Sequence, residues 1–578
     1  MFEQLSEIQR QIAIVKTGKV VVRACPGSGK TYSVAARLAY RTSHWESPNS
    51  GIAAISFTNV AWEEIRKKLS EDFELPFFTY PHFLGTIDSF INNYIFLPHG
   101  HLIMGCNHRP ILVGEPHSTW NVKRYENDYD QYFDIVSYDS DDKLLYPEIQ
   151  GTFFFPYKQI YLKNGSESQH ASNLRKTKTK YWKLGYANQH DANYFALRLL
   201  EKYPCIAKAL SIRFTELILD EAQDTNSIQM RILEILCAKG VSEIMLVGDP
   251  DQAIFEWNNA KPQLFKSKYD EWADNSILLN DNRRSSQSIC DCTFHLSTLE
   301  NKSVSANPEV KNFNQSPLIV VFDPNNLKAT IDLFLNKCQE LSIEINPENI
   351  AILCRSKSFI NPLLGNPSIT QEKWTQDYSF TYQVLHACFL YNSGLLKQAI
   401  KILESVLYKV ISKNNLATKK DIDRHMEKTG FLKYRTSVYN FLKYLPPARG
   451  NLKDWITLAN AKINGANPFS ILAEANNLNI ESLFTLTETE MPNLNFTVGT
   501  VHSVKGETFE AVLQFLKTKG IGKNYTTLIN QNVSTSEDEE LRIVYVGITR
   551  PRRFLMLAVP DDANKMAWEN KLGLKNLK

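Results

Sequence analysis

The chain has 578 residues, and its 65 Lys and Arg nearly balance its 62 Asp and Glu, which leaves a formal net charge of +3. At roughly 150 residues per domain, this length excludes a single small binding module and predicts several folded units. Hydrophobic residues make up 43% of the chain and charged residues 22%, which is close to the globular average and argues against global disorder.

The sequence has no run of about eighteen uncharged apolar residues, and its first residues lack the basic flank and apolar stretch of a signal peptide. We therefore expect a cytoplasmic protein with no membrane span. The nine cysteines are widely spread and never spaced as CxxC pairs, so neither a zinc site nor an iron–sulfur cluster is predicted. Even the close pair Cys290 and Cys292 is interpreted as reduced thiols.

The first notable segment is predicted to be a strand, a loop and a helix. A β-branched run, KVVVR (19–23), precedes ACPGSGKT (24–31), and the following residues SVAARLAYRT have helical periodicity. Three later apolar runs read as buried strands that end in polar residues: GIAAISFT (51–58), FTELILDEAQD (214–224) and EIMLVGDPDQ (243–252). Polar residues at the carboxyl ends of parallel strands mark the expected ligand site of an open α/β sheet.

Residues 91–210 interrupt this series of strand patterns. They are rich in Tyr, Asn, Asp and His, and they are predicted to be an insertion. A second, mainly helical interruption covers 361–490, with its clearest amphipathic segment at 386–411. Strand patterns frame this second interruption in four places, at 317–323, 349–356, 495–503 and 553–559. Two α/β lobes, each interrupted, fit this order.

Gly27, Gly29, Lys30 and Thr31 have the types and spacing of a phosphate loop. Small residues let backbone N–H groups turn toward phosphate oxygens, the lysine meets the β- and γ-phosphates, and the hydroxyl ligates Mg²⁺. The general pattern has glycine where this chain has Ala24, a relaxation that leaves the cradle intact. The alternative is an ordinary glycine-containing turn, but the flanking strand and helix favour nucleotide binding.

Asp220 and Glu221 follow the apolar residues LIL at a predicted strand end. One carboxylate in such a place can hold magnesium while the next polarises a water for in-line phosphoryl displacement. A surface pair is the structural alternative. The position at a strand end and the following residues AQDTN favour catalysis.

Nine motifs occur in the order Gln9, ACPGSGKT, FTNVA, GTIDSF, LILDEAQDTN, VGDPDQAIFEW, NDNRRS, VGTVHSVKGETFEAV and YVGITRPRR. Together they resemble the UvrD/PcrA/Rep family of superfamily-one DNA helicases, although any one of them apart from the phosphate loop would be weak. The resemblance implies two RecA-like P-loop lobes with parallel sheets, each carrying an inserted, mainly helical subdomain.

The domain boundaries follow from combining this resemblance with the strand and helix patterns. The ATP-binding first lobe is predicted at 1–90 and 211–283, a DNA-contacting first insertion at 91–210, the second lobe at 284–360 and 491–578, and a reduced second insertion that offers a partner surface at 361–490.

The resemblance implies ATP and Mg²⁺ as cofactors, and it assigns binding roles to the matching residues. Gln9 would read the adenine edge, and Thr31 and Asp220 would hold Mg²⁺. The phosphates would be bound by Gly27, Ser28, Gly29 and Lys30.

It also implies catalytic roles. Glu221 would be the general base, and Gln252 would sense the γ-phosphate. Arg284 and Arg550 would act as arginine fingers from the second lobe, neutralising the transferred phosphoryl group only when the lobes close on ATP. A salt bridge at a helix end is the alternative for each arginine.

For single-stranded or tailed DNA, the resemblance implies aromatic side chains that stack on bases along a groove across both lobes. The residues at matching positions are Phe57, Asn59, Thr86, Trp257 and His502. A buried core position is the alternative for Trp257 and Phe57. The stretch Arg175–Lys183 mixes charges with two aromatic residues and fits either a DNA contact or a solvated basic face.

Several residues depart from the family pattern. Tyr32 and Arg283 stand where relatives have an arginine and a tyrosine that sandwich adenine, so we expect the sandwich to persist with its halves exchanged. Asp88 replaces a histidine, Thr508 a glutamate that approaches the nucleotide sugar, and Pro551 an alanine. Ribose discrimination and the DNA contacts near Asp88 therefore stay open.

The wording GTIDSF and HSVKGET is similar to a shorter branch of the family, typified by the helicase-like subunit of the Gabija anti-phage defence system, which works beside a separate OLD-family (TOPRIM) nuclease. We therefore expect a 3′→5′ DNA translocase or helicase that serves antiviral defence with such a nuclease. Since 28 residues follow Arg550, a fused nuclease domain is not expected. The alternatives are an ATP-gated sensor of DNA ends that does not unwind, and a stand-alone repair helicase.

Overall fold

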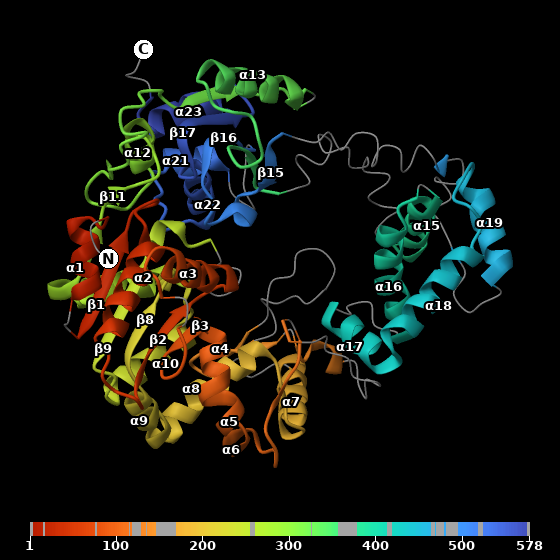
Figure 1. The fold of residues 1–578 in the computed structure, drawn as a ribbon, viewed down its shortest axis with the longest axis horizontal. Helices are drawn as coiled ribbons and strands as arrows, with labels where there is room; N and C mark the ends of the chain where they lie inside the picture. The colour runs from red at the N-terminus through yellow and green to blue at the C-terminus, as the bar shows by residue number, and fades with distance from the viewer. Residues whose placement is uncertain are drawn as a thin grey trace. The chain divides into compact units, whose positions relative to one another are not determined.

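The structure is a computed structural model (Figure 1), and the chain divides into two compact units. The first unit comprises Met1–Ile111, Tyr132–Arg355 and Asn495–Lys578, and the second comprises Leu112–Gln131 and Ser356–Leu494. The residues described are 4–15, 18–75, 78–114, 116–117, 129–134, 136–145, 169–254, 260–324, 326–356, 379–392, 394–412, 419–463, 469, 479–480, 495–517 and 524–574.

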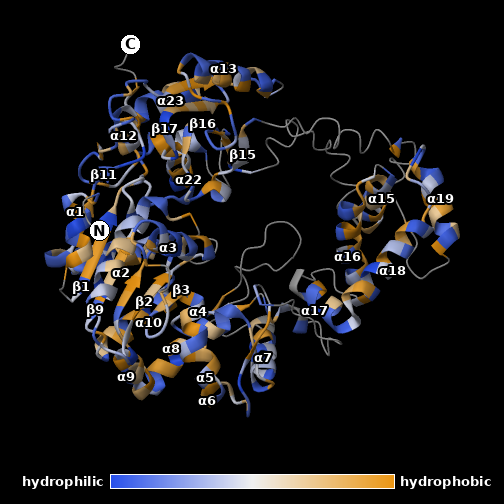
Figure 2. Cartoon of the chain, viewed as in Figure 1, coloured by the Kyte–Doolittle hydropathy of each residue, from blue (hydrophilic) through white to orange (hydrophobic). Residues whose placement is uncertain are grey.

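The first unit contains a six-stranded, all-parallel sheet with the strand order β10-β1-β9-β8-β2-β3. Its strands are β1 (Lys19–Ala24), β2 (Gly51–Ser56), β3 (Phe83–Thr86), β8 (Phe214–Leu219), β9 (Glu243–Gly248) and β10 (Ile277–Leu279). Figure 2 shows β1 and β2 in the hydrophobic colours, as expected for strands that are covered on both faces.

The alternation of side chains along these strands separates two cores. Val21, Leu217 and Leu246 belong to the core on one face, whereas Val20, Val22 and other residues of the same strands belong to the core on the other face. The helices of this lobe are α1 (Glu7–Ile14), α2 (Lys30–Ser43), α3 (Asn59–Glu71), α4 (Ile87–Ile91), α10 (Ser227–Ala238) and α11 (Pro262–Glu271).

Three of these helices are capped by a threonine or an asparagine; α3 and α4 begin within three residues of a strand, and α10 follows the short helix η4 (Ala222–Asp224) after β8. Thr58 Oγ1 accepts from Ala61 N at 3.2 Å before α3, and Thr86 Oγ1 accepts from Ser89 N at 3.1 Å before α4. Asn226 caps α10 in the same way. Such caps satisfy the first helical N–H groups and hold the strand-to-helix turns at the carboxyl edge of the sheet.

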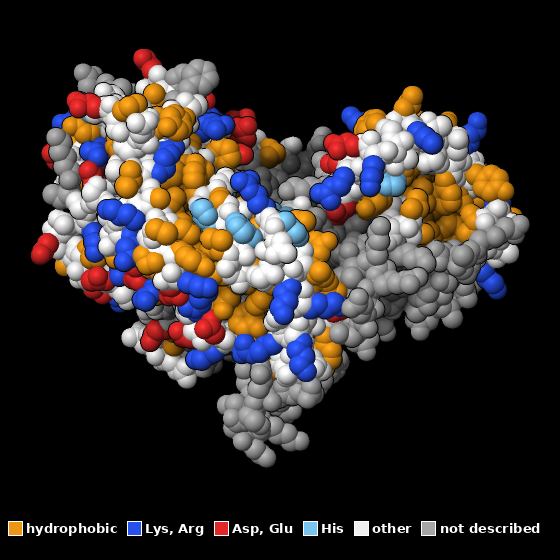
Figure 3. All heavy atoms as spheres, turned by 90° about the horizontal axis from the view of Figure 1, so that it is seen from below, with side chains coloured by type: hydrophobic (Ala, Val, Ile, Leu, Met, Phe, Trp, Pro, Cys, Tyr) orange, Lys and Arg blue, Asp and Glu red, His pale blue; other side chains and the backbone are white. Residues whose placement is uncertain are grey.

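An inserted segment of short elements follows β3. It contains η1 (Asn92–Phe96), α5 (Leu97–His99), α6 (His101–Met104), β4 (Ile111–Leu112), η2 (Asp130–Tyr132), β5 (Ser137–Tyr138), β6 (Leu144–Leu145), α7 (Gln169–Lys183), β7 (Tyr186–Ala187), α8 (Gln189–Lys202) and α9 (Pro204–Arg213). Figure 3 looks at the molecule from below the view of Figure 1 and shows Lys, Arg and His side chains between patches of hydrophobic side chains.

The stretch Arg175–Lys183, interpreted as either a DNA contact or a solvated basic face, is partly buried in the structure. In α7, Lys178 is 1% exposed, and its Nζ lies 2.8 Å from Asp191 Oδ2 and donates to Phe133 O at 2.7 Å. Tyr181 is also buried, in ring contact with Phe133. Two of the supposed contact residues therefore stabilise the interior of the insertion, because helical periodicity turns one face of α7 inward.

A second parallel sheet, with the order β13-β17-β16-β14-β15, also lies in the first unit. Its strands are β13 (Leu318–Val321), β14 (Ile350–Cys354), β15 (Thr497–Thr500), β16 (Phe509–Phe515) and β17 (Pro551–Val559). The surrounding elements are β11 (Asp281–Asn282), α12 (Gln287–Phe294), β12 (Val304–Ser305), α13 (Leu327–Glu340), η11 (Val501–Val504), α21 (Tyr525–Asn530), α22 (Glu539–Ile548) and α23 (Asp562–Lys571). Parallel sheets in an α/β arrangement confirm the predicted fold class.

The second unit is helical, with α15 (Ser379–Asn392), α16 (Leu396–Ser412), α17 (Lys419–Thr429), α18 (Phe431–Tyr444) and α19 (Leu452–Ile463) around one apolar core. The amphipathic segment at 386–411 is helical in two pieces, because the chain turns at Gly394, whose φ is +83°. Within the described ranges, no helix combines the length and apolar character that spanning a bilayer would require.

Candidate nucleotide site between the two sheets

The phosphate loop lies between β1 and α2, at the carboxyl edge of the first sheet. Gly27 and Gly29 have left-handed backbones, with φ of +70° and +78°. A Cβ placed on Gly27 would lie 2.6 Å from the Cβ of Arg284, and Gly27 O accepts from Arg283 N at 2.9 Å. Glycine is therefore required at position 27 both for its φ and for the close approach of the arginine segment.

Asp220 and Glu221 stand at the end of β8, next to the phosphate loop. Thr31 Oγ1 donates to Asp220 Oδ2 at 3.3 Å, and Lys30 Nζ lies 3.9 Å from Glu221 Oε1. Glu221 has a φ of +55°. A left-handed backbone at a residue other than glycine costs about 1–3 kcal/mol and is found most often at functional sites.

The pKa values of these two neighbouring carboxyl groups are shifted in opposite directions. Burial, and then the charge of Glu221, hold the pKa of Asp220 above its usual range. Burial also raises the pKa of Glu221, but the charges of Lys30 and Lys505 and a hydrogen bond from Gln223 outweigh it and hold that pKa below its usual range. The Glu221 carboxylate is therefore ionised at neutral pH.

Gln252 connects the first sheet to Arg550 of the second. It ends the short helix η5 (Pro250–Gln252) after β9, and its Nε2 donates to Asp249 Oδ2 at 2.5 Å. Its Oε1 accepts from Arg550 Nη2 at 2.9 Å. Arg550 is 1% exposed, and burial, opposed by the charge of Glu221, lowers its pKa to about 10, so the guanidinium stays charged at neutral pH.

Arg284 lies on the same cavity as Arg550 and is held by groups near the second sheet. Its Nε donates to Thr508 Oγ1 at 2.8 Å, and its Nη1 donates to Thr549 O at 3.0 Å. Burial, and then the neighbouring charge of Arg550, hold the pKa of Arg284 well below its usual value. Two guanidinium groups thus face the loop and carboxylates of the first sheet.

One cavity of about 1150 Å³ brings these groups together. The predicted nucleotide-site residues that line it are Gln9, Gly27, Ser28, Gly29, Lys30, Thr31, Tyr32, Glu221, Gln252, Arg283, Arg284 and Arg550. Asp220 is fully buried and meets the cavity through its bond with Thr31. Residues more than 500 positions apart in the sequence therefore share one site.

The end of the cavity predicted to hold the base contains Gln9, Tyr32 and Arg283. Gln9 is fully buried; its Oε1 accepts from Ser6 N at 3.1 Å and its Nε2 donates to Ser28 O at 3.2 Å, so the amide also braces the phosphate loop. The Tyr32 ring packs on Phe73 with centroids 5.2 Å apart. Burial and Asp72 raise the pKa of Tyr32, and the charge of Arg283 opposes this shift.

Some of the residues predicted to contact DNA line the large cavity and others do not. Phe57 and His502, which follow β2 and β15, both line the large cavity. Asn59 is exposed at the start of α3 and accepts from Trp62 Nε1 at 3.1 Å, whereas the Thr86 hydroxyl caps α4. Trp257 lies outside the described residues.

Asp88 lies within a polar network. Its Oδ1 accepts from Asn193 Nδ2 at 3.0 Å and from Gln229 Nε2 at 3.1 Å. Asp88 therefore joins α4 to α8 of the insertion and to α10 of the lobe, which gives this departure from the family pattern a structural role.

Two contacts between the lobes involve residues that sequence reasoning did not single out. Asp251, which is fully buried, accepts from Thr298 Oγ1 at 2.8 Å and from Thr535 Oγ1 at 2.7 Å. Lys505 Nζ lies 2.7 Å from Asp224 Oδ2. Both carboxylates and Lys505 stand inside motifs, DPDQ, DEAQD and HSVKGET, whereas Thr298 and Thr535 lie outside the motifs and carried no sequence signal.

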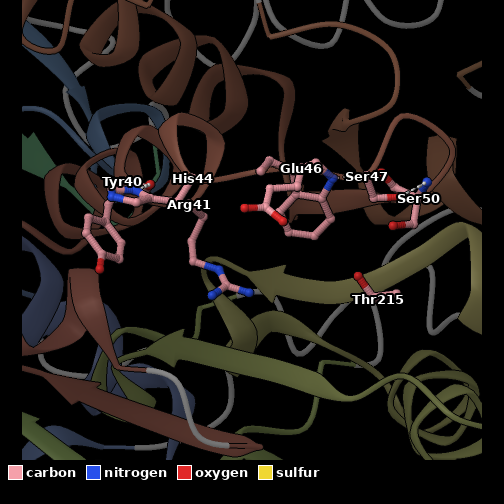
Figure 4. Close-up of a pocket in the computed structure, with 8 residues that line it drawn as sticks. Tyr40, Arg41, His44, Glu46, Ser47, Ser50 and Thr215 are labelled. Carbon is pink, nitrogen blue, oxygen red and sulfur yellow. Dashed lines mark hydrogen bonds between the residues drawn. The ribbon is translucent and has the colours of Figure 1, made fainter.

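A second, smaller hollow lies near the C-terminal end of α2 (Figure 4) and is lined by Tyr40, Arg41, His44, Trp45, Glu46, Ser47, Ser50 and Thr215. Several of its polar groups already bond to one another or to their surroundings. Arg41 pairs with Glu216 and Glu243 at 2.7 and 2.8 Å, and Trp45 Nε1 donates to Ser50 O at 2.8 Å. The predicted chemistry is therefore concentrated in the larger cavity.

The fold and the cavity define a two-lobed P-loop architecture. Residues 5–273 match the family of the UvrD/REP helicase N-terminal domain, a range that covers the inserted segment and all strands of the first sheet except β10. This part of the chain is therefore UvrD-like.

Individual relatives agree with this match. Over 334 residues the chain is 25% identical to a probable DNA helicase II homologue of Mycoplasma capricolum, covering 56% of this chain and 44% of the relative. It is 23% identical to DNA helicase II of Haemophilus influenzae over 310 residues, which cover 51% of this chain and 40% of the relative. A shorter segment of 108 residues is 37% identical to the exonuclease/helicase subunit RexA of Streptococcus pneumoniae. It covers 18% of this chain and 9% of the relative. The chain thus spans less than half the length of these relatives.

Proposed function

We propose that the chain is an ATP-dependent DNA translocase or helicase. The observation that carries this proposal is the single cavity in which Lys30 and Glu221 of the first sheet meet Arg550 from the second. The match of residues 5–273 to UvrD/REP helicases and the similarity to proteins named DNA helicase II support it.

In this proposal the cavity binds ATP with its phosphates on the loop Gly27–Thr31. Backbone N–H groups at the start of α2 face the anionic oxygens, and Lys30 meets the outer phosphates. The ionised carboxylate of Glu221 accepts a hydrogen bond from the attacking water and orients it in line with the γ-phosphate. Gln252 links that phosphate to Arg550 through the bond between their side chains.

The residues present also fit magnesium. The Thr31 hydroxyl and the Asp220 carboxylate are hard oxygen ligands, and they already lie 3.3 Å apart. They would hold the ion beside the β- and γ-phosphates, where bound Mg²⁺ neutralises phosphate charge. Burial of Asp220 raises its pKa, and a cation at this site would favour the ionised carboxylate.

Arg284 and Arg550 are the proposed arginine fingers. Charge grows on the phosphoryl oxygens in the transition state, and a guanidinium held nearby stabilises that charge. Because both arginines are held by groups of the second lobe, hydrolysis depends on the relative position of the two lobes. This dependence is the proposed basis for coupling ATP turnover to movement along DNA.

For DNA, we propose a single strand that passes Phe57, Asn59, Thr86, Trp257 and His502, with 3′→5′ movement as the family resemblance implies. Phe57 and His502 supply aromatic surface from both lobes, and base stacking tolerates any sequence. The helical unit adds exposed cations that suit phosphate contacts, among them Lys397, Lys401, Lys433, Lys443 and Lys453.

We further propose that this motor serves antiviral defence in the Gabija manner, with a separate OLD/TOPRIM-type nuclease as its partner. The similarity of one segment to a protein whose name joins exonuclease and helicase supports an association with nuclease activity. The helical segment 361–490 is the proposed surface for that partner.

The test is ATP hydrolysis and strand displacement by the purified chain on 3′-tailed, 5′-tailed and blunt DNA, with and without an OLD-type nuclease. DNA-stimulated hydrolysis with release of the strand from 3′-tailed DNA supports the proposal. Stimulated hydrolysis without strand release supports an ATP-gated DNA-end sensor instead. Robust unwinding with no stable nuclease complex supports a stand-alone repair helicase.

A further inference from the structure

Among the described residues, one side chain, that of Thr508, holds the Arg284 guanidinium by a hydrogen bond. The hydroxyl of Thr508 accepts from Arg284 Nε at 2.8 Å, whereas the second anchor, at 3.0 Å, is the backbone oxygen of Thr549. These bonds use two of the five N–H groups of the guanidinium and leave three for an anion. Removing the hydroxyl would therefore leave the guanidinium with the backbone anchor alone, so that it can turn about that one hydrogen bond without any change to the backbone.

Thr508 is well placed to serve as such an anchor. It is exposed on the lining of the large cavity, directly before β16, and its neighbour Glu507 accepts from Arg550 Nη1 through the backbone oxygen at 3.5 Å. Phe509 N donates to Arg550 O at 3.2 Å. The three-residue segment Glu507–Phe509 thus contacts both arginines that face the phosphate loop.

We propose that Thr508 is a positioning residue for Arg284: its hydroxyl holds the guanidinium in the orientation that meets the transferred phosphoryl group. The nucleotide sugar is then not its ligand. The inference rests on the proposed ATP hydrolysis and adds to it a residue whose contribution is to turnover rather than to ATP binding.

This assignment predicts a specific kinetic pattern. A group that only positions an arginine finger acts on the transition state, so its loss lowers kcat and leaves the KM for ATP almost unchanged. A group that binds the sugar acts equally on ground and transition states, so its loss raises KM and leaves kcat unchanged. The two roles are therefore separable by steady-state kinetics.

The variants are Thr508→Val, which keeps the shape and removes the hydroxyl, and Thr508→Ser, which keeps the hydroxyl. Thr497→Val is the matched control, since that hydroxyl donates to Pro347 O at 2.7 Å on β15. We expect Thr508→Val to lower kcat about 10- to 100-fold with KM changed less than about 2-fold, and Thr508→Ser to stay within about 3-fold of the wild type. Thr497→Val should match the wild type.

A second readout is the binding of ADP with aluminium fluoride, which mimics the transferred phosphoryl group. Thr508→Val should weaken this binding about 10-fold or more and leave the affinity for ADP alone unchanged. Unchanged kcat in Thr508→Val, equal losses in the Val and Ser variants, or a rise in KM for ATP larger than that for dATP would each overturn the inference. A wild-type chain that fails to hydrolyse ATP would instead overturn the proposed function.

Discussion

Arg550 and Gln252 are joined side chain to side chain, Nη2 to Oε1 at 2.9 Å, although they lie next to strands of different sheets and 298 positions apart in the sequence. Gln252 in turn donates to Asp249 at the end of β9. If the γ-phosphate binds at Gln252, as proposed, it lies one hydrogen bond away from Arg550. We propose this connection as the route from nucleotide state to lobe position.

Lys30 and Glu221 are expected to have different roles, which ATP binding and ATP hydrolysis can tell apart. We expect Lys30→Ala to abolish turnover, because the lysine meets the phosphates, and Glu221→Gln to bind ATP normally while kcat falls about 100-fold or more. Equilibrium binding of a fluorescent ATP analogue and steady-state ATP hydrolysis measure the two effects. Normal turnover in either variant would remove the assigned role. Glu243→Gln, at the distant end of β9, is the control for a lost carboxylate.

Tyr32 and Arg283 are expected to hold the adenine base between a ring and a guanidinium. Replacing both by alanine should raise the KM for ATP about 10-fold, because each stacking contact contributes about 0.5–2 kcal/mol, and should change kcat little. Tyr32→Phe keeps the ring and its packing on Phe73, so it should behave as the wild type. A double alanine variant with the wild-type KM would refute the exchanged sandwich.

His502 is expected to contact DNA as a neutral side chain. Burial, and then the charge of Arg355, hold its pKa below the usual value of 6.5. Because the lowered pKa favours the unprotonated ring, the positive charge appears only as the pH falls through that lowered value, well below neutrality. The salt dependence of single-stranded DNA affinity should therefore have the same slope at about pH 7 and about pH 8. A steeper slope at about pH 7 that disappears in His502→Gln would contradict this expectation.

The buried pair of Lys178 and Asp191 should stabilise the inserted segment without binding DNA. Lys178→Met leaves the Asp191 charge buried and unpaired, and we expect the free energy of unfolding to fall by about 3 kcal/mol. Lys176→Met, on the exposed side of the same helix, should change it by less than about 0.5 kcal/mol. Urea unfolding followed by circular dichroism measures both. Equal stability of the two variants would restore the interpretation of α7 as a solvated basic face.

The sequence predicts local features well, since strand, loop and helix around Lys30 depend on neighbouring residues. The β-branched run becomes β1, and the glycines take the left-handed angles that a phosphate loop requires. Asp220 and Glu221 also lie at a strand end, as the preceding apolar residues indicate.

Contacts between distant segments are the part that local patterns cannot predict. Lys178 reads as a basic surface residue because its partner Asp191 lies on the next helix, and only the packing of α7 on α8 buries both. The Thr508 hydroxyl meets Arg284 across 224 positions of sequence. The resemblance showed only that Thr508 replaces a glutamate that approaches the sugar and left ribose discrimination open, whereas in the structure its hydroxyl accepts from the Arg284 guanidinium.

The most direct test of the two-lobed site is the DNA-stimulated rate of ATP hydrolysis in Arg550→Lys, compared with Arg553→Lys. Arg553 lies three residues further along and pairs with Glu510, so it controls for the loss of a guanidinium near β17. We expect Arg550→Lys to lower kcat about 100-fold at nearly unchanged ATP affinity and Arg553→Lys to match the wild type. Full turnover in Arg550→Lys would contradict a catalytic site assembled from both lobes.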